Sequence, residues 1–202
     1  NAIGAILGDG WYAGYFSYQG KRNLYGVDPS MLVQLEIETS DGKKQTIVSD
    51  ESWKCAYGPI READLLMGSA FDARRTIDGW NTIGFDDSKW SPAEIAAAPK
   101  ALIESYPGDL PRRHEEIRAT NLTEPTKGVY VFDLGQNIVG WTKLTVRNSK
   151  PGAKITLRHS EMLNPDGTPY TIALRGARAM DTFWPKGEKQ ETFEPQFTFH
   201  GF

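Results

Sequence analysis

Short runs of alternating apolar and polar residues, separated by turn signals, constrain the fold of this 202-residue chain more than any other feature. Residues 31–39 (MLVQLEIET) alternate in this way, Asp41-Gly42 follows as a tight-turn pair, and residues 44–55 supply the returning strand. Because successive side chains of a strand point to opposite faces, such a run buries one face only. The pattern therefore predicts antiparallel hairpins packed face to face.

The same pattern returns in the second half of the chain. NPDG at residues 164–167 is a strong turn signal, since Pro presets φ and Gly closes the turn. The strand-like runs around it are residues 128–135, 141–148, 153–163 and 193–202. We predict an all-β fold of two antiparallel, jelly-roll-like β-sandwiches, with both ends of the sequence cut from a longer polypeptide.

One window alone has a helical pattern. Residues 91–104 (SPAEIAAAPKALIE) open with a Ser-Pro pair that suits a helix start, and Pro99 is expected to break the helix. A polar, Pro-bearing stretch follows. We therefore place the first sandwich at residues 1–105, with its connection beginning near residue 91, and the second sandwich at residues 106–202, where the sequence could end within the last strand.

Composition and charge argue against several classes of function for this chain. The net charge is −3 and no Lys or Arg run stands out, so nothing favours a nucleic-acid partner. No apolar stretch reaches transmembrane length, so we expect no membrane partner. The lone Cys55 excludes an intramolecular disulfide and a cysteine-built metal site. The three histidines lie far apart and lack metal-ligand spacing: His114, His159 and His200. The cellular compartment stays open.

The aromatic residues of the first half allow two interpretations. Trp11, Tyr12, Trp80 and Trp90 could stack on the faces of sugar rings, or they could fill the sandwich. Packing is the favoured interpretation, because aromatic side chains mostly supply buried area. A purely structural role predicts that all three of these tryptophans are buried.

Two loops carry oxygen donors that suit a sugar or a hard cation. In FDARR, Asp72 could accept hydrogen bonds from vicinal hydroxyls or bind Ca²⁺, although an internal ion pair with Arg74 is the default. The loop that contains Asn23 and Asp28 combines amide, carbonyl and carboxylate oxygens, which are the ligands that Ca²⁺ prefers. A loop satisfied by its own hydrogen bonds is the alternative there.

Other acidic residues are better explained by structure than by chemistry. In GFDDSKW (residues 84–90), an Asp that caps a turn beneath Trp90 predicts a structural corner, with sugar contact by Asp86 or Asp87 as the alternative. Glycoside hydrolysis needs two positioned carboxyl groups. Turns and strand ends account for the acids grouped in the second half: Glu161, Asp166 and Asp181.

Several motifs in one collinear order resemble bacterial α-L-rhamnosidases. In the first half they are GDGWYAGYFSYQGKRNLYG, LVQLEIETSDGKKQTIVSDESWK, GPIREADLLMGSAFDARR and GFDDSKW. In the second half they are GVYVFDLGQNIVGWTKLTV, LRHSEMLNPDGTPYT, LRGARAMDTF and FEPQFTFHGF. The resemblance implies a galactose-binding-like sandwich followed by a concanavalin-like sandwich, both preceding a catalytic (α/α)6 barrel that is absent here.

The resemblance also implies that catalysis belongs to a different domain of the parent enzyme. Members of this family are inverting glycosidases that release terminal α-L-rhamnose, and their acid and base lie on the barrel, so no catalytic residue is carried over. The chain is then a non-catalytic accessory region that reaches rhamnose-containing carbohydrate through its parent enzyme and requires no cofactor of its own.

Some members bind L-rhamnose with calcium on an accessory sandwich, which makes a Ca²⁺-assisted rhamnose-binding module the alternative. The residues that it would use are Trp11, Asn23 and Asp72 for the sugar, with Asn23 and Asp28 for the ion. The chain departs from the family's Gly-Glu and Tyr-Asp-Ala-Arg pattern, because Ser69 follows Gly68 and Phe71 replaces the Tyr.

Overall fold

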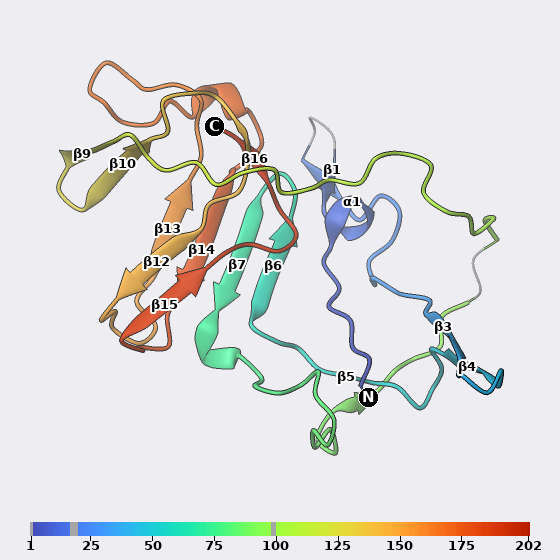
Figure 1. Cartoon of the computed structure of the whole chain (residues 1–202). Helices are drawn as coiled ribbons and strands as arrows, with labels where there is room; N and C mark the ends of the chain where they lie inside the picture. The colour runs from blue at the N-terminus through green and yellow to red at the C-terminus, as the bar shows by residue number, and fades with distance from the viewer. Residues whose placement is uncertain (1, 17–19, 98–99) are drawn as a thin grey trace.

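A computed structural model describes residues 2–16, 20–97 and 100–202 of the chain. Almost all of its regular structure is β, which confirms the predicted fold class (Figure 1). Helix within the described residues is limited to three short pieces: α1 (Gly10–Ala13) and the 3-10 turns η1 (Ala73–Arg75) and η2 (Ile172–Leu174).

The largest sheet takes strands from both halves of the sequence. Its order is β13-β14-β7-β6, and its bounds are Ile155–Arg158, Met180–Trp184, Gly68–Asp72 and Ile60–Asp64. β6 pairs with β7 across a short turn, and β13 pairs with β14 across a longer connection that contains η2; both pairs are antiparallel. The two pairs join through a parallel pairing of β7 with β14, the one parallel pair among the described strands. The first and second halves therefore share one hydrogen-bonded sheet, while the boundary near residue 105 stays a prediction.

A second layer covers this sheet and closes the core. It is the antiparallel pair of β12 (Leu144–Arg147) and β15 (Gln190–Phe193). Phe193 of this pair stacks on Phe183 of β14, with ring centroids 5.2 Å apart, and Phe71 of β7 packs beside both rings. This contact between two layers is the aromatic centre that a sandwich needs.

The other strands form small two-stranded units. The hairpin predicted at Asp41-Gly42 is confirmed, because Glu38 pairs with Lys44 across it and Gly42 takes a φ of 79°. The units are β1 (Tyr15–Phe16) with β2 (Lys21–Arg22), β3 (Gln34–Glu38) with β4 (Lys44–Val48), β5 (Lys54–Cys55) with β8 (Ser91–Pro92), β9 (Asn121–Thr126) with β10 (Val129–Asp133), and β11 (Val139–Gly140) with β16 (His200–Gly201).

The helix predicted at residues 91–104 is wrong. Ser91 and Pro92 form β8 against β5 instead, and the described remainder of the window is irregular. Ile95, Leu102 and Ile103 are exposed there, so no surface stabilises an apolar helical face, and short helices depend on such packing. Pro99, the expected helix breaker, lies outside the described residues.

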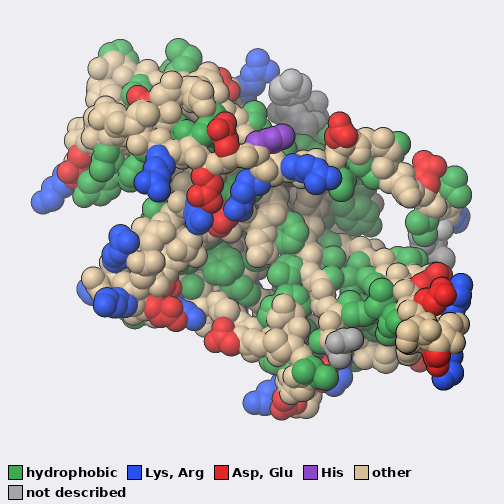
Figure 2. All heavy atoms as spheres, in the orientation of Figure 1, with side chains coloured by type: hydrophobic (Ala, Val, Ile, Leu, Met, Phe, Trp, Pro, Cys, Tyr) green, Lys and Arg blue, Asp and Glu red, His purple; other side chains and the backbone are tan. Residues whose placement is uncertain are grey.

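Much apolar surface faces solvent. The described chain exposes 15272 Å², whereas a compact protein of 22.5 kDa exposes about 9,500 Å². Figure 2 shows hydrophobic side chains lying open in the hollowed middle of one face. Trp11 is 44% exposed, and Trp80 and Trp90 are half-buried, so the prediction that all three are buried is wrong. These rings lie outside the packed sandwich.

Candidate functional site

A buried cluster of two histidines and one aspartate lies at one end of the large sheet. His159 directly follows β13, Asp181 lies on β14, and His200 begins β16. Their exposed fractions are 4%, 0% and 5%. The two imidazole rings stack with centroids 4.3 Å apart and planes inclined by 21°. The sequence-based view of these histidines as far apart is therefore wrong, because strand pairing brings them together.

Hydrogen bonds fix the state of the His159 ring. Its Nδ1 lies 3.1 Å from the carbonyl oxygen of Ala179, and its Nε2 lies 2.9 Å from the hydroxyl of Thr142. Because a carbonyl can only accept, Nδ1 carries the proton and Nε2 accepts from the hydroxyl. Burial, and secondarily the neighbouring His200, hold the pKa of His159 below its ordinary value. The ring is therefore neutral, with the Nε2 lone pair toward the Thr142 hydroxyl.

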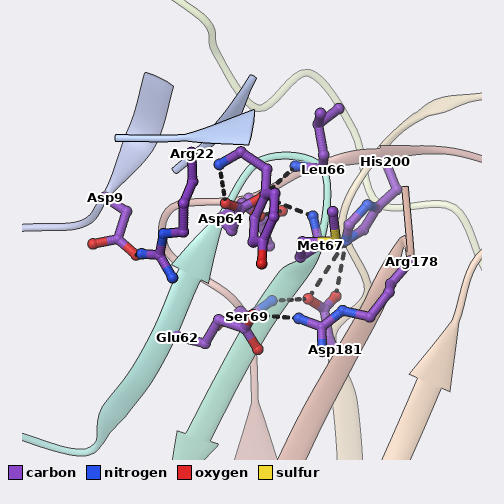
Figure 3. Close-up of polar contacts among 12 residues, drawn as sticks. Asp9, Arg22, Glu62, Asp64, Leu66, Met67, Ser69, Arg178, Asp181 and His200 are labelled. Carbon is purple, nitrogen blue, oxygen red and sulfur yellow. Dashed lines mark hydrogen bonds and ion pairs between the residues drawn. The ribbon is translucent and has the colours of Figure 1, made fainter. Parts of the chain in front are cut away.

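Asp181 accepts hydrogen bonds on one carboxylate oxygen and none on the other. Its Oδ1 accepts a 2.7 Å hydrogen bond from the backbone N–H of Ser69, and His200 Nε2 lies 3.4 Å from both carboxylate oxygens (Figure 3). Oδ2 is fully buried and has no hydrogen-bond partner. A buried unsatisfied oxygen is costly, so the orphan atom marks the cluster as a candidate ligand site.

Gly68 makes the close approach to this cluster feasible. Its φ is 106°, and a Cβ at this position would lie 2.1 Å from the carbonyl oxygen of Met180 and 3.1 Å from Asp181 Oδ1. Only glycine combines that backbone conformation with that contact. The β6–β7 turn can thus present the Ser69 N–H to the carboxylate.

Asp64 anchors the surrounding segments. Its Oδ1 accepts from the N–H groups of Leu66 and Met67 at 2.8 Å each, and its Oδ2 accepts from the N–H of Tyr15 at 2.6 Å (Figure 3). The hydroxyl of Thr198 donates to the backbone oxygen of Asp64 at 3.1 Å. The side chain of Asp64 therefore stabilises the β6–β7 turn and binds β1 to that turn. Its backbone oxygen binds Thr198, in the segment that leads to His200.

A shallow pocket of about 390 Å³ lies beside β15. Trp141 Nε1 donates to Glu194 Oε1 at 2.8 Å, and the guanidinium of Arg113 lies over the indole ring and pairs with the same carboxylate. An aromatic ring with polar neighbours could receive a sugar, but the charged groups here already satisfy one another. Sequence reasoning did not single out this pocket.

The residues predicted to bind sugar or calcium are spread over the molecule. Trp11 lies on α1 and makes an edge-to-face contact with Phe16 at 5.3 Å. Asn23 and Asp28 lie in an exposed loop, where Asn23 has a φ of 61°. Asp72 ends β7, whereas α1 lies beside the opposite end of that strand (Figure 1). The structure does not bring Asp72 together with Trp11.

Asp72 forms the internal ion pair that was the default interpretation. Arg74 Nε and Nη2 reach its two oxygens at 2.8 Å each, and Arg75 Nε lies 3.7 Å from Oδ2. These contacts, first the hydrogen bonds from Arg74, hold the pKa of Asp72 below its ordinary value. The carboxylate also caps η1 by accepting from the Arg74 N–H. Its acceptor positions are therefore used within the chain.

Residues 84–90 form the predicted structural corner. Asp86 accepts from the backbone N–H of Ser88 at 3.0 Å, and Asp87 pairs with Lys54 at 2.8 Å. Phe85 and Trp90 pack edge to face at 5.5 Å. In the second half, Asp166 holds the confirmed NPDG turn by accepting from the N–H of Thr168.

No helix within the described residues is long and apolar enough to cross a membrane.

Comparison with known proteins places this fold in a family. The profile of the α-L-rhamnosidase N-terminal domain matches residues 1–115, and that of the bacterial α-L-rhamnosidase concanavalin-like domain matches residues 123–202. An α-L-rhamnosidase from Streptomyces avermitilis is 46% identical over the whole chain, and one from an Alteromonas species is 35% identical. The chain spans 20% and 22% of these relatives, about a fifth of their length.

Solved structures agree with the sequence comparison. The chain superposes on an Aspergillus terreus α-L-rhamnosidase with a TM-score of 0.91 and 38% identity, over 97% of this chain and 23% of that one. The S. avermitilis enzyme, solved in complex with L-rhamnose, superposes with a TM-score of 0.84 and 43% identity. The match covers 96% of this chain and 19% of that one. The catalytic domain of these relatives lies outside the matched region. The chain therefore belongs to the α-L-rhamnosidase family, as a region that carries its N-terminal and concanavalin-like domains.

Proposed function

We propose that this chain is the non-catalytic accessory region of an α-L-rhamnosidase that hydrolyses terminal α-L-rhamnose from glycosides. The observation that carries the proposal is the collinear match of both domains to rhamnosidases over the whole chain. The parent enzyme acts on rhamnose-containing carbohydrate through its missing catalytic barrel.

The buried acids of this region support a structural role. Asp64 and Asp72 are used by hydrogen bonds and ion pairs, and Glu191 accepts from three consecutive backbone N–H groups, those of Lys186, Gly187 and Glu188. An inverting glycosidase needs one acid to protonate the leaving oxygen and another to activate water, with about 6.5–9.5 Å between them. In our proposal, both groups belong to the barrel.

The exposed apolar side chains support a role in positioning that barrel. Leu122, Tyr130 and Phe132 on the β9–β10 hairpin are exposed, as are Leu102 and Tyr106 on the connection. Covering such surface stabilises an interface by about 25 cal/mol per Å² of apolar area removed from water. We propose that the region packs against the catalytic domain and fixes its orientation.

Rhamnoside hydrolysis by the full-length enzyme and by the separate region tests the proposal. With an aryl α-L-rhamnoside, the full-length enzyme should release L-rhamnose with inversion, as followed by proton NMR of the anomeric signals. The separate region should release none. Replacing Asp72 by Asn in the full-length enzyme should leave kcat within about twofold, since in our proposal its carboxylate serves the ion pair with Arg74.

Two results would overturn the proposal. The first is hydrolysis by the separate region, and the second is a full-length enzyme that cleaves other glycosides but no rhamnoside. Calorimetric titration of the region with L-rhamnose, with and without Ca²⁺, adds a direct check. Saturable heat would replace the positioning role with a binding module.

A further inference from the structure

We propose that His159, Asp181 and His200 form a binding site for a divalent transition-metal ion, with Zn²⁺ as the probe. Two imidazole nitrogens and one carboxylate oxygen come from three segments of the chain, and these atoms lie within 4.8 Å of one another. The proposal rests on these three residues alone, so neither it nor its test depends on the proposed function.

One of the distances between the donor atoms already suits tetrahedral coordination, and a second is close to it. Zn–N and Zn–O bonds of about 2.0–2.2 Å in a tetrahedron place neighbouring ligand atoms roughly 3.3–3.5 Å apart. Asp181 Oδ2 lies 3.4 Å from His200 Nε2 and 3.9 Å from His159 Nε2. The first pair is already at the required spacing. The second must close by about half an ångström on the same geometry.

The surrounding contacts orient the donors as ligands. Metal-bound histidines usually donate the second ring N–H to a carbonyl or carboxylate. His159 does so through Nδ1 to the Ala179 carbonyl, and its Nε2 lone pair accepts from the Thr142 hydroxyl in the absence of an ion. Asp181 Oδ1 accepts from the Ser69 N–H, whereas Oδ2 accepts no hydrogen bond and lies 3.4 Å from His200 Nε2 (Figure 3). A bound ion would coordinate Asp181 Oδ2, which accepts no hydrogen bond.

Two hydrogen bonds must be exchanged when the ion binds: that of His159 Nε2 with the Thr142 hydroxyl, and that of His200 Nε2 with Asp181 Oδ1, 3.4 Å away. Thr142 Oγ1 occupies His159 Nε2 at 2.9 Å, and the two rings stack rather than converge. His159 must therefore rotate away from its stacked position and give up the Thr142 hydroxyl. Thr142 thus competes with the metal, which makes its side chain a diagnostic position.

The donor set selects the ion. Ca²⁺ takes six to eight oxygen ligands, whereas imidazole suits Zn²⁺, Cu²⁺, Fe²⁺ and Ni²⁺. With exposed fractions of 5% or less for all three ligands, the site is closed to substrate. An ion there would tie β13 and β14 to β16 and act as a structural cross-link.

Zn²⁺ binding by the full-length enzyme, freed of metal by a chelator, tests this site. Isothermal titration should show a saturable Zn²⁺ site, and elemental analysis after dialysis should retain that Zn²⁺. Asp181→Asn keeps the shape of the side chain but removes its charge, and it should weaken this binding at least tenfold. Asp72→Asn makes the same change on neighbouring β7 and should leave binding unchanged.

Thr142→Val separates metal binding from a simple hydrogen-bond network. It removes the hydroxyl that competes for His159 Nε2 and should leave Zn²⁺ affinity equal or up to threefold tighter. If the cluster were only a hydrogen-bond network, Thr142→Val would lower the free energy of unfolding, and added Zn²⁺ would not restore it. The exposed His114→Gln should behave as wild type in every measurement.

A spectroscopic measurement on the wild type keeps the proposal falsifiable if Asp181→Asn does not fold. The X-ray absorption fine structure of the Zn²⁺-loaded enzyme should show two imidazoles, and His200→Gln should reduce that number. The proposal is overturned if wild type retains no Zn²⁺, or if Asp181→Asn folds and binds Zn²⁺ as tightly as wild type does.

Discussion

The two-layer core and the N-terminal arm, which we define as residues 2–16 and 20–55, differ in how their strands are stabilised. In the core, β7 pairs with β14 from a distant part of the sequence, and residues of β7, β13 and β14 pack in the aromatic cluster with β12 and β15. In the arm, the β3–β4 hairpin has a complete ladder but exposed side chains. Turn chemistry is thus enough to set strand register, while stability requires a second layer.

Truncating one side chain in each region tests this difference most strongly. Phe183 is 1% exposed between two aromatic neighbours, so Phe183→Ala should lower the free energy of unfolding by about 3–5 kcal/mol. Leu35→Ala on β3, where the side chain is 38% exposed, should cost less than about 1 kcal/mol. Urea unfolding followed by tryptophan fluorescence measures both. Equal losses would contradict the distinction between core and arm.

Two glycines with positive φ sharpen the same comparison. Gly68→Ala should lower the free energy of unfolding by about 3 kcal/mol or more, because φ strain adds to a clash with the Met180 carbonyl. Gly42→Ala has the φ strain but nothing within 4 Å of the new Cβ, and should cost about 1 kcal/mol. Thermal unfolding of the two variants measures the difference. A Gly42 variant as damaged as the Gly68 variant would show that contacts in the core are irrelevant.

Asp64 links the core to the arm and should reveal how strongly they are coupled. Asp64→Asn weakens the acceptor for three backbone N–H groups and should cost about 1–3 kcal/mol. Hydrogen exchange at the Tyr15 amide should accelerate in this variant more than exchange in β13. Asp50→Asn, at an exposed turn, serves as the control. Unchanged protection at Tyr15 would show that the arm is held by other contacts.

Acid should destabilise the core through two carboxylates. Hydrogen bonds from Arg74 lower the pKa of Asp72, and for Glu191 three backbone N–H groups outweigh the desolvation that opposes them. Because both folded pKa values lie below the ordinary values of 3.8 and 4.5, this stability is complete above about pH 5 and is lost as the pH falls through the folded values.

Urea unfolding at pH 6 and pH 3 measures this acid effect. In Glu191→Gln the loss between the two pH values should be smaller than in wild type. The exposed Glu51→Gln should leave the loss unchanged, and an equal change in both variants would contradict the assignment to the core.

Features encoded by neighbouring residues could be predicted from the sequence. The β3–β4 hairpin, the NPDG turn and the corner at residues 84–90 each depend on local turn chemistry, and the structure contains all of them. The Asp72–Arg74 ion pair could be predicted for the same reason, since the two residues lie on one short turn.

Features that depend on distant pairing could not be predicted. The parallel contact of β7 with β14 has no local signal, and neither has the meeting of His159 with His200. The failed helix at residues 91–104 had a suitable pattern but found no surface to pack against. Hydrophobic periodicity and secondary-structure propensity describe one segment at a time. The candidate site consists of residues from three segments, so these signals could not predict it.

The parallel contact also bears on how the chain is made. Ser69 and Asp181, which it brings together, are 112 residues apart. At about 5–20 residues per second, a ribosome adds the later segment on the order of ten seconds after the earlier one. The edge of β7 stays uncovered during that interval and is open to wrong partners. Nascent-chain folding of this region should therefore depend on holdase chaperones until β14 has emerged.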